Sequence, residues 1–296
     1  MPELPEVETV RRGLKNFILH KKLTKIEILC EKSFIGEKTN GEIKNIRRFG
    51  KALVLDLDND KSLMIHLRMT GQLIYDGEER YAAGHPSENF TANLPNKQTR
   101  VILTFENGTL YFNDQRKFGF IKVIETKNVE NDSFIKKLAK EPWEMTADEL
   151  YKSLQRHKNS LIKPTILDQT IICGLGNIYA DEALFGAKIH PERKSGTITK
   201  EETEKLLKSA CEVMEKSINS GGSTMATYVK ADGTKGDYLE KFAKVFRREG
   251  KLCENCRTEI VKIKVAGRGT HLCPNCQPAP VKNEQSAYVS SEKRRK

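Results

Sequence analysis

The stretch CENCRTEIVKIKVAGRGTHLCPNC, residues 253–276, decides the architecture of the C-terminal part of this chain. Cys253 and Cys256 form one Cys-x-x-Cys pair, Cys273 and Cys276 form a second, and 16 residues separate the two pairs. Four thiolates in this arrangement bind Zn²⁺ tetrahedrally and leave no position open for water or substrate. A redox-active thiol pair is the alternative, and two evenly matched pairs argue against it. The sequence therefore predicts one Zn²⁺ with a structural role.

The residues between the two cysteine pairs have the pattern of a β-hairpin. Apolar and polar residues alternate over 261–265, and glycines at 267 and 269 mark the turn. Arg268 lies at the predicted tip, where it can reach a phosphate or enter a nucleic-acid groove. Because four cysteines already complete a zinc site, we interpret His271 as a packing or phosphate-contacting residue.

Composition limits the protein to a few classes. The chain has 296 residues, enough for two modest domains, and its 51 Lys and Arg against 40 Asp and Glu give a net charge of +11. This excess favours a polyanionic partner such as nucleic acid, although a lysine-rich surface without such a partner fits it equally well. No apolar run approaches the roughly 20 residues that span a bilayer, and the acidic start MPELPE is unlike a signal peptide. We therefore expect a cytoplasmic protein with no membrane partner.

The first 132 residues are predicted to form a β-sandwich behind one leading helix. Apolar residues from Val7 to Ile18 have helical spacing, which predicts a helix from Pro5 to about Leu19. Residues 51–57 and 63–69 read as two strands around a turn. Residues 100–105 and 109–112 read as a second hairpin around Asn107-Gly108.

Helical periodicity returns over residues 133–240. Capping boxes at Thr146 with Glu149 and at Thr199 with Glu202 predict two helix starts, and the second helix is predicted to stop at Gly221-Gly222. The turn 174–177, GLGN, opens a predicted helix at 178–185 and offers backbone N–H groups to an anion, with Asn177 as helix cap or phosphate donor. A helix-turn-helix without a ligand would look similar. The zinc finger is assigned to 241–280, and 281–296 to a disordered basic tail.

The N-terminus offers a second kind of chemistry. Removal of Met1 would give Pro2 a free secondary amine with a pKa near ~8, against ~10.4 for a lysine, so it can act as a nucleophile at neutral pH. Glu3 and the supporting Glu6 lie beside it and offer carboxyl groups for proton transfer. Judged by residue type alone, a proline at position 2 has no function in most proteins.

Three motifs resemble the formamidopyrimidine-DNA glycosylases. MPELPEVETVRRGL at 1–14 resembles their amino terminus, LDQ and GLGNIYADE within 167–182 resemble their helix-two-turn-helix, and GRGTHLCPNCQ at 267–277 resembles their zinc finger. The resemblance implies an α+β fold of two domains: an N-terminal β-sandwich with a leading helix, and a C-terminal helix-two-turn-helix domain with a zinc-finger β-hairpin. It also implies a monomer that binds double-stranded DNA.

The resemblance also implies roles for individual residues. Pro2 matches the nucleophile, Glu3 the acid that assists opening of the deoxyribose, and Lys51 the lysine that contacts phosphate and lesion. The residues that match phosphate-gripping positions are Lys163, Asn177 and Arg268. A solvated surface lysine is the ordinary alternative for Lys51.

Two further loops resemble the wedge that fills the stack once the damaged nucleotide is extruded. HLRMTG at 66–71 and QRKFG at 115–119 nominate Met69, Arg116 and Phe118. Without the resemblance, a core role would be the default interpretation of Met69 and Phe118. The second loop has Asp-Gln-Arg-Lys where the family often has Asp-Pro-Arg-Arg, which leaves its fine geometry in doubt. The loop from Gly221 to Tyr238 resembles the lid over the flipped base.

The function implied is base-excision repair. The enzyme would excise oxidised purines such as 8-oxoguanine and formamidopyrimidines through a Pro2 Schiff base, and would cleave the abasic site by β,δ-elimination. The related endonuclease VIII branch, which prefers oxidised pyrimidines, is the nearest alternative. A zinc-finger DNA-binding protein without catalysis is the alternative from another class.

Overall fold

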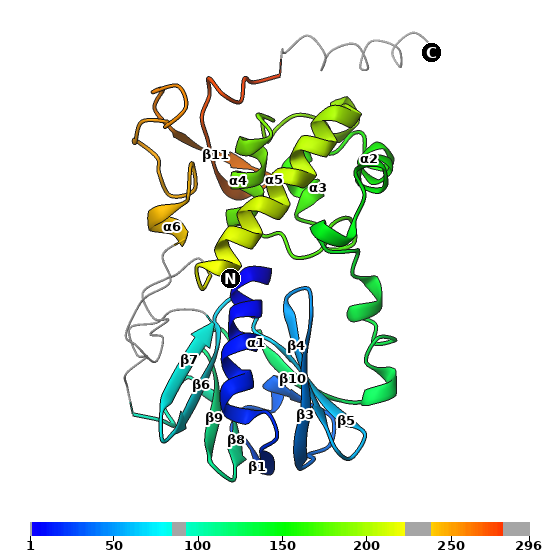
Figure 1. Cartoon of the computed structure of the whole chain (residues 1–296), viewed down its shortest axis with the longest axis vertical. Helices are drawn as coiled ribbons and strands as arrows, with labels where there is room; N and C mark the ends of the chain where they lie inside the picture. Colours follow the sequence, from blue (N-terminus) through cyan, green and yellow to red (C-terminus); the bar gives the residue numbers. More distant parts are fainter. Residues whose placement is uncertain (1, 85–92, 223–237, 281–296) are drawn as a thin grey trace, which may run out of the picture. The chain divides into compact units, whose positions relative to one another are not determined.

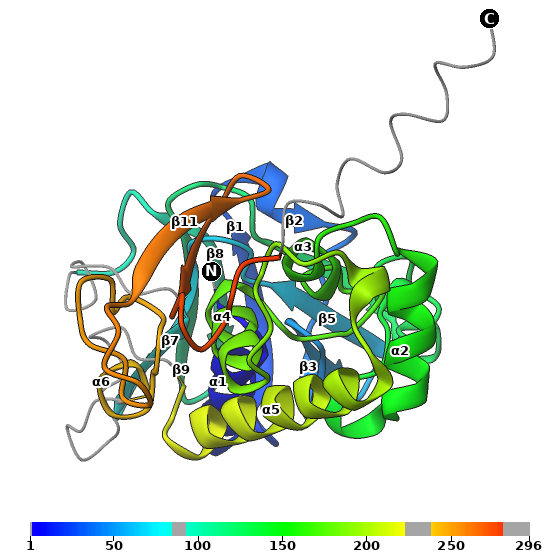
Figure 2. The same ribbon diagram turned by 90° about the horizontal axis from the view of Figure 1, so that it is seen from above.

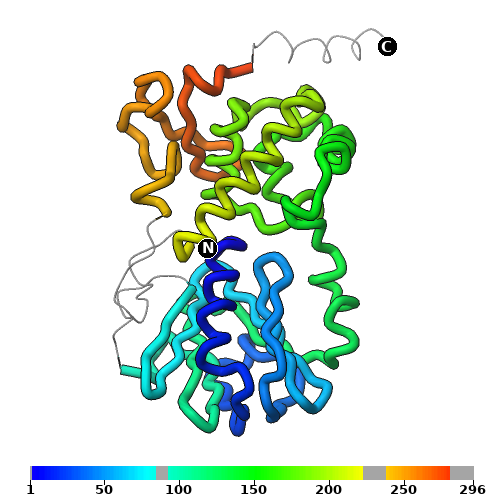
Figure 3. Tube along the Cα trace, in the orientation of Figure 1, coloured from blue at the N-terminus to red at the C-terminus, as the bar shows by residue number. Residues whose placement is uncertain are grey.

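The computed structural model describes residues 2–84, 93–222 and 238–280. The predicted lid between Gly222 and Tyr238 and the predicted tail lie outside the described residues. The chain forms two compact units, which are described separately; Figure 3 traces the path of the chain. Unit 1 comprises Met1–Met145, Asp168–Gly176 and Cys211–Ala243, and unit 2 comprises Thr146–Leu167, Asn177–Ala210 and Lys244–Lys296. The predicted helical domain, 133–240, is therefore divided between the two units: 133–145, 168–176 and 211–240 belong to unit 1, and the rest belongs to unit 2.

Unit 1 is a β-structure closed by one helix. Its helices are α1 (Leu4–Ile18), the second half of α5 (Lys200–Asn219) and α6 (Tyr238–Lys241), and its strands are β1 (Lys22–Ile28), β2 (Phe34–Ile35), β3 (Gly41–Phe49), β4 (Ala52–Leu57), β5 (Lys61–His66), β6 (Gly71–Gly77), β7 (Arg80–Gly84), β8 (Thr99–Phe105), β9 (Gly108–Asp114) and β10 (Phe120–Glu125). The strand order is β2-β10-β5-β4-β3-β1-β8-β9-β6-β7. Only two residue pairs join β3 to β1, so the sheet divides there into two halves. Figure 1 shows these halves as two fans of strands with α1 along them. The predicted sandwich with a leading helix is confirmed.

The leading helix α1 closes the core between the two halves. Its apolar face, with Val7, Val10 and Leu14 fully buried, joins a cluster that includes Leu53 of β4 and Phe112 of β9. The helix packs on β7 of one half and on β3 of the other. Burial of this face therefore fixes where the beginning of the chain lies in unit 1.

The hairpin of β4 and β5 differs from the prediction at one end. The return strand was predicted to run to Met69, but β5 ends at His66. Arg68 has a φ of 50°, and the Gly71 N–H donates to the Leu67 carbonyl at 2.8 Å, so 67–70 form a turn. Met69 therefore lies on a loop rather than in a strand. The hairpin of β8 and β9 confirms the prediction.

Unit 2 contains the remaining helices and the cysteine hairpin. Its elements are α2 (Ala147–Arg156), α3 (Ile162–Ile166), α4 (Asn177–Gly186), the first half of α5 (Lys200–Asn219), β11 (Val261–Val265) and β12 (Arg268–Leu272). Both predicted capping boxes are confirmed: the Glu149 N–H donates to Thr146 and the Glu202 N–H donates to Thr199. Figure 2 shows the hairpin beside α4, which contacts β12. Among the helices of the described residues, none has the length and apolar composition that crossing a membrane requires.

Candidate active site

The first residues of the chain are buried in unit 1. Pro2 and Glu3 are both buried, and Glu3 directly precedes α1 as its cap residue. The Glu3 N–H donates to Glu6 Oε2 at 2.7 Å, so the Glu6 carboxylate caps the helix start. Within the predicted site, Glu6 therefore has a structural role as the hydrogen-bond partner of the Glu3 N–H.

The turn at residues 174–176, far along the sequence, holds this N-terminus in place through hydrogen bonds. The Leu4 N–H donates to the Gly174 carbonyl at 3.2 Å, and the Gly176 N–H donates to Glu3 Oε2 at 2.8 Å. Lys51 Nζ donates to the Leu175 carbonyl at 2.6 Å. Three consecutive residues of the turn thus bring Glu3 and Lys51 into one site. This turn was predicted to offer its N–H groups to a phosphate, and the anion that Gly176 binds here is the Glu3 carboxylate.

The two glycines of this turn are required by close approach. A Cβ on Gly176 would lie 2.2 Å from the carboxyl carbon of Glu3, and a Cβ on Gly174 would lie 2.4 Å from a Leu4 methyl carbon. Gly174 also has a φ of 95°, where other residues are strained. The glycines therefore serve contact with the N-terminus, a purpose that their sequence spacing did not reveal.

Sequence reasoning assigned no role to Gln169, which supports the same turn. Its Oε1 accepts the Gly174 N–H at 3.0 Å, and its Nε2 donates to the Leu175 carbonyl at 3.0 Å. The same carbonyl also receives the Lys51 ammonium. The LDQ motif at 167–169 includes Gln169, but the resemblance gave this glutamine no role of its own, and a single glutamine in a loop has no spacing signature.

Lys51 enters the site from the turn before β4. It is buried, and its neighbour in the sheet, Ala52, pairs with His66 of β5. Burial, together with the charges of Arg68 and Lys51, lowers the pKa of His66 to about 3. The neutral imidazole accepts the Arg68 N–H at Nδ1 with a distance of 3.0 Å. His66 therefore fixes the turn that carries Met69 without adding charge.

The two predicted wedge loops both present exposed apolar side chains. Met69 is 38% exposed and Phe118 is 55% exposed, so neither side chain belongs to the core. The Arg116 guanidinium lies 4.9 Å from the centre of the Phe118 ring. This apolar-plus-arginine pair matches the predicted composition of a wedge.

Asp114 connects the two loops. Its carboxylate accepts hydrogen bonds from the Thr70 hydroxyl of the first loop and from the Arg116 and Gly119 N–H groups of the second. Asp114 is fully buried, so these hydrogen bonds are shielded from water. Met69 and Phe118 are therefore presented by one hydrogen-bonded assembly.

The zinc prediction rests on four sulfur atoms in unit 2. The Sγ atoms of Cys253, Cys256, Cys273 and Cys276 all lie within 4.8 Å of one another. Four Zn–S bonds of about 2.3 Å in a tetrahedron place sulfurs about 3.8 Å apart, so the group fits one Zn²⁺. Phe185, Val245 and Ile260 pack around the cysteines. These four residues form a zinc site without an open position, and its role is structural.

The environment of Lys163 differs from that predicted for a phosphate-gripping residue. Its side chain is fully buried, and Nζ lies 2.6 Å from Asp181 Oδ1. The same Nζ donates to the Thr270 hydroxyl at 2.8 Å and to the Gly269 carbonyl at 3.2 Å. Asp181 Oδ2 in turn accepts the His271 N–H. Lys163 thus connects α3, α4 and the zinc hairpin inside unit 2.

We predict that Lys163→Met lowers the free energy of unfolding by about 3–5 kcal/mol, because it leaves the Asp181 carboxylate buried without its cation. Denaturant unfolding measures this loss, and Lys264→Met, at an exposed position of the same hairpin, is the matched control. The salt dependence of DNA binding distinguishes this structural role of Lys163 from a phosphate contact. Unchanged stability with a slope reduced by about one phosphate contact would instead assign Lys163 to the DNA backbone.

Asn177 and Arg268 are more exposed than the buried Lys163. Asn177 is the first residue of α4, and its Nδ2 donates to the Gly269 carbonyl at 2.9 Å, so its side chain binds the hairpin and does not cap the helix. Arg268 is exposed at the hairpin tip, next to the positive-φ residues Ala266 and Gly267. A depression of about 500 Å³ beside them is lined by Asn177, Phe246, Arg247, Glu249, Lys262, Gly269 and His271. Its excess of cationic side chains suits a phosphate backbone.

Comparisons with known proteins agree along the chain. Residues 1–121 match the family model of the formamidopyrimidine-DNA glycosylase N-terminal domain, and residues 138–229 match that of the formamidopyrimidine-DNA glycosylase H2TH domain. Residues 250–279 match a zinc finger found in FPG and IleRS.

Relatives match over the same length. A formamidopyrimidine-DNA glycosylase of Desulfitobacterium hafniense is 38% identical over 94% of this chain and 100% of its own. One from Pelotomaculum thermopropionicum is 40% identical over 94% of this chain and 99% of its own. The wild-type Lactococcus lactis Fpg (MutM), solved with an N7-benzyl-Fapy-dG containing DNA, is 36% identical with a TM-score of 0.81 over 94% of this chain and 100% of that chain. MutM in complex with carbocyclic 8-oxo-G containing DNA has the same identity, TM-score and coverage.

Proposed function

The chain belongs to the formamidopyrimidine-DNA glycosylase family, and we propose that it excises oxidised purines from duplex DNA in base-excision repair. We also propose that it then cleaves the strand at the abasic site. The observation that carries this proposal is the burial of Pro2 and Glu3 beside Lys51, clamped by the turn 174–176. A protein that only binds DNA needs no such enclosure of its first residues.

The proposed chemistry begins at the amine of Pro2, once Met1 has been removed. The nitrogen lone pair attacks C1′ of the damaged nucleotide, and the glycosidic bond breaks with its electron pair leaving on the base, which takes a proton from water. The Pro2 ammonium formed by this attack passes its proton to the Glu3 carboxylate. Glu3 then donates that proton to the ring oxygen as the C1′–O4′ bond opens, which leaves an iminium between Pro2 and C1′.

Strand cleavage follows from the iminium, which acidifies the C2′ protons. Loss of one C2′ proton expels the 3′ phosphate by β-elimination, and a second proton loss expels the 5′ phosphate by δ-elimination. Water then releases the sugar fragment from Pro2. The product is a one-nucleotide gap with phosphates at both ends, and no cofactor is consumed.

The remaining site residues are proposed to bind DNA. Lys51 contacts a phosphate and the lesion from its position beside the turn 174–176. Met69, Arg116 and Phe118 fill the space that the flipped nucleotide leaves, since a glycosylase must extrude its target to reach C1′. Asn177 and Arg268 contact phosphates, and Zn²⁺ stabilises the hairpin that carries Arg268.

Borohydride trapping tests the proposal. The protein, shown by mass spectrometry to lack Met1, is incubated with a duplex that carries one 8-oxoguanine opposite cytosine, and borohydride is added. We expect a covalent adduct that peptide mapping assigns to Pro2. Binding without an adduct would reject the chemistry and leave a DNA-binding protein. A faster adduct with an oxidised pyrimidine duplex would instead support the endonuclease VIII preference.

A further inference from the structure

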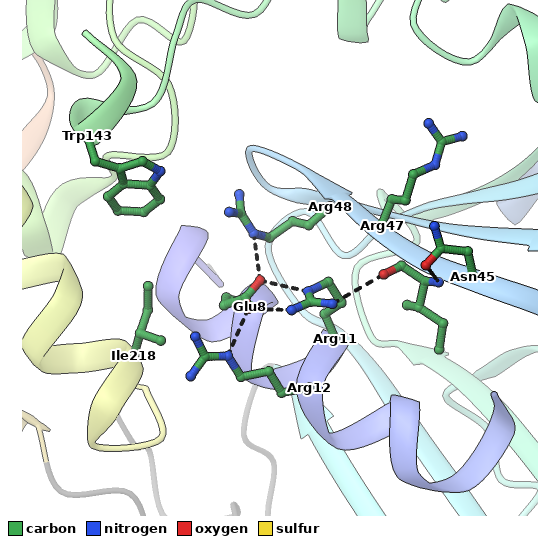
Figure 4. A pocket seen from close by; sticks show the side chains of 9 residues that line it. Glu8, Arg11, Arg12, Asn45, Arg47, Arg48, Trp143 and Ile218 are labelled. Atoms are coloured by element: carbon green, nitrogen blue, oxygen red, sulfur yellow. Dashed lines mark hydrogen bonds and ion pairs between the residues drawn. The ribbon is translucent and has the colours of Figure 1, made fainter. Parts of the chain in front are cut away.

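Glu8, on the second turn of α1, is the centre of a group of arginines that the proposed chemistry does not use. Its carboxylate accepts hydrogen bonds from Arg11 at 2.8 and 2.9 Å, from Arg12 at 2.8 Å and from Arg48 at 3.1 Å. Figure 4 shows these three guanidinium groups around the Glu8 carboxylate. Burial alone would raise the pKa of Glu8, but the arginines lower it to about 2. Glu8 is therefore a carboxylate at any physiological pH.

Arg48 extends this group towards the catalytic lysine. Its side chain is only 11% exposed, and its far end forms a two-pronged ion pair with Glu141, with Nη2 at 2.9 Å from Oε2. Arg48 Nη1 also donates to the Gly50 carbonyl at 3.0 Å, while the Gly50 N–H donates to Glu141 Oε1 at 3.2 Å. Both backbone groups of Gly50 are thus bound by the pair, and the next residue is Lys51.

The result is a continuous set of charged contacts between two parts of the active site. One end lies on α1, which Pro2 and the cap residue Glu3 directly precede, and the other end lies on the turn that carries Lys51. The two-pronged geometry of an arginine–carboxylate pair restricts orientation as well as distance. Residues Glu8, Arg48 and Glu141 are here called the Glu8–Arg48–Glu141 brace.

The same arginines line a cavity of about 470 Å³ together with Trp143 and Ile218 (Figure 4), which raises the possibility of an anion site. Each of these arginines already has a carboxylate partner within the described part of the chain, and Arg11 and Arg12 both bind Glu8. Arg47 forms a two-pronged pair with Asp56, and Arg48 pairs with both Glu8 and Glu141. Pairing inside the protein, rather than a bound anion, therefore accounts for the cluster.

We propose that Glu8 and Arg48 are positioning residues that keep Pro2 and Lys51 in the relative geometry needed for attack on C1′. This inference rests on the proposed function of the same site. A displacement of about 1 Å between reacting groups can lower a rate about 100-fold. The brace would thus act on the rate of adduct formation without touching DNA.

The test measures single-turnover adduct formation by borohydride trapping, and separates its rate constant from its amplitude. We expect Glu8→Gln to lower the rate constant by about 10- to 100-fold. The amplitude, which counts competent molecules, should stay close to that of the unmodified protein. The Kd for a duplex with a non-cleavable abasic-site analogue should not change, because the brace carries no proposed DNA contact.

A second variant and a control make the test independent of folding. Arg48→Lys retains the positive charge but cannot reach both carboxylates and Gly50 together, so it should lower the rate constant in the same direction. Arg12→Ala removes a Glu8 partner whose side chain is 56% exposed, and should leave the rate constant unchanged. Trp143 is the only tryptophan of the chain and lines this cavity, so its fluorescence reports whether each variant is folded.

The outcomes distinguish a failure of the proposed function from a failure of the positioning role. If the unmodified protein forms no adduct at Pro2, the proposed function fails and the brace has no reaction to assist. If it forms the adduct and Glu8→Gln or Arg48→Lys lowers only the amplitude and the melting temperature, the brace is structural and the inference is wrong. If Glu8→Gln does not fold, the rate constant of adduct formation by Arg48→Lys decides whether the brace positions the reacting groups.

Discussion

Pro2→Gly is expected to lower adduct formation and base release by about 1,000-fold, because it removes the ring that orients the attacking nitrogen. Glycine keeps a free α-amine with a pKa near ~8, so the variant alters orientation and amine substitution rather than the presence of an N-terminal amine. Binding to a duplex with a non-cleavable abasic-site analogue should persist. Single-turnover kinetics and borohydride trapping measure the first effect, and fluorescence anisotropy measures the second.

Pro5, three residues after Pro2, provides a matched control. Pro5 lies in the first turn of α1 and is also buried, but its nitrogen is part of the peptide chain and cannot attack a sugar. Pro5→Gly should lower stability by less than about 1 kcal/mol through added backbone freedom and retain the adduct. Unchanged turnover in Pro2→Gly would remove Pro2 from the reaction.

Loss of the metal is expected to produce the second large effect. Cys256→Ser removes one of four thiolates, and structural Zn²⁺ contributes about 10–16 kcal/mol of binding free energy to small domains of this kind. The cluster around the cysteines has few apolar partners, so the segment 250–277 should lose its fold without zinc. DNA affinity should then fall at least about 100-fold, since the hairpin carries Arg268 and supports Asn177.

Metal analysis measures the zinc content of the variant, and anisotropy titrations measure its affinity for DNA. Cys211→Ser is the control, because Cys211 lies on α5 outside the four-cysteine cluster. The control should bind zinc and DNA as the unmodified protein does. A zinc-free Cys256→Ser protein with full DNA affinity would mean that the hairpin acts without its metal.

The features that could be predicted from the sequence are those with a local signature. Two Cys-x-x-Cys pairs, two capping boxes and an Asn-Gly turn each act within a few residues, and the structure confirms all of them. The strand end at His66 was missed because period-two alternation continues through Met69, and nothing in the sequence indicates the positive φ of Arg68 or the hydrogen bond from its N–H to His66.

The features that the sequence left undetermined are pairings between distant residues. The Gly176 N–H binds Glu3 across 173 positions, and Arg48 binds Glu141 across 93. Lys163 illustrates the same difficulty, because the family resemblance matched it to a phosphate contact, whereas in the structure it is buried against Asp181, which lies one helix away. A charged side chain gives no sign in sequence of whether water or a buried partner will satisfy it.

The clamp of the N-terminus by residues 174–176 has a consequence for biosynthesis. Pro2 and Glu3 are among the first residues to leave the ribosome, yet their partners in the turn are made about 170 residues later, on the order of 10–30 s at ordinary elongation rates. During that interval the chain has its proposed nucleophile but not the turn that binds the N-terminus. The proposed site can therefore be assembled only after the glycine turn has been made, when 120 of the 296 residues are still to be added.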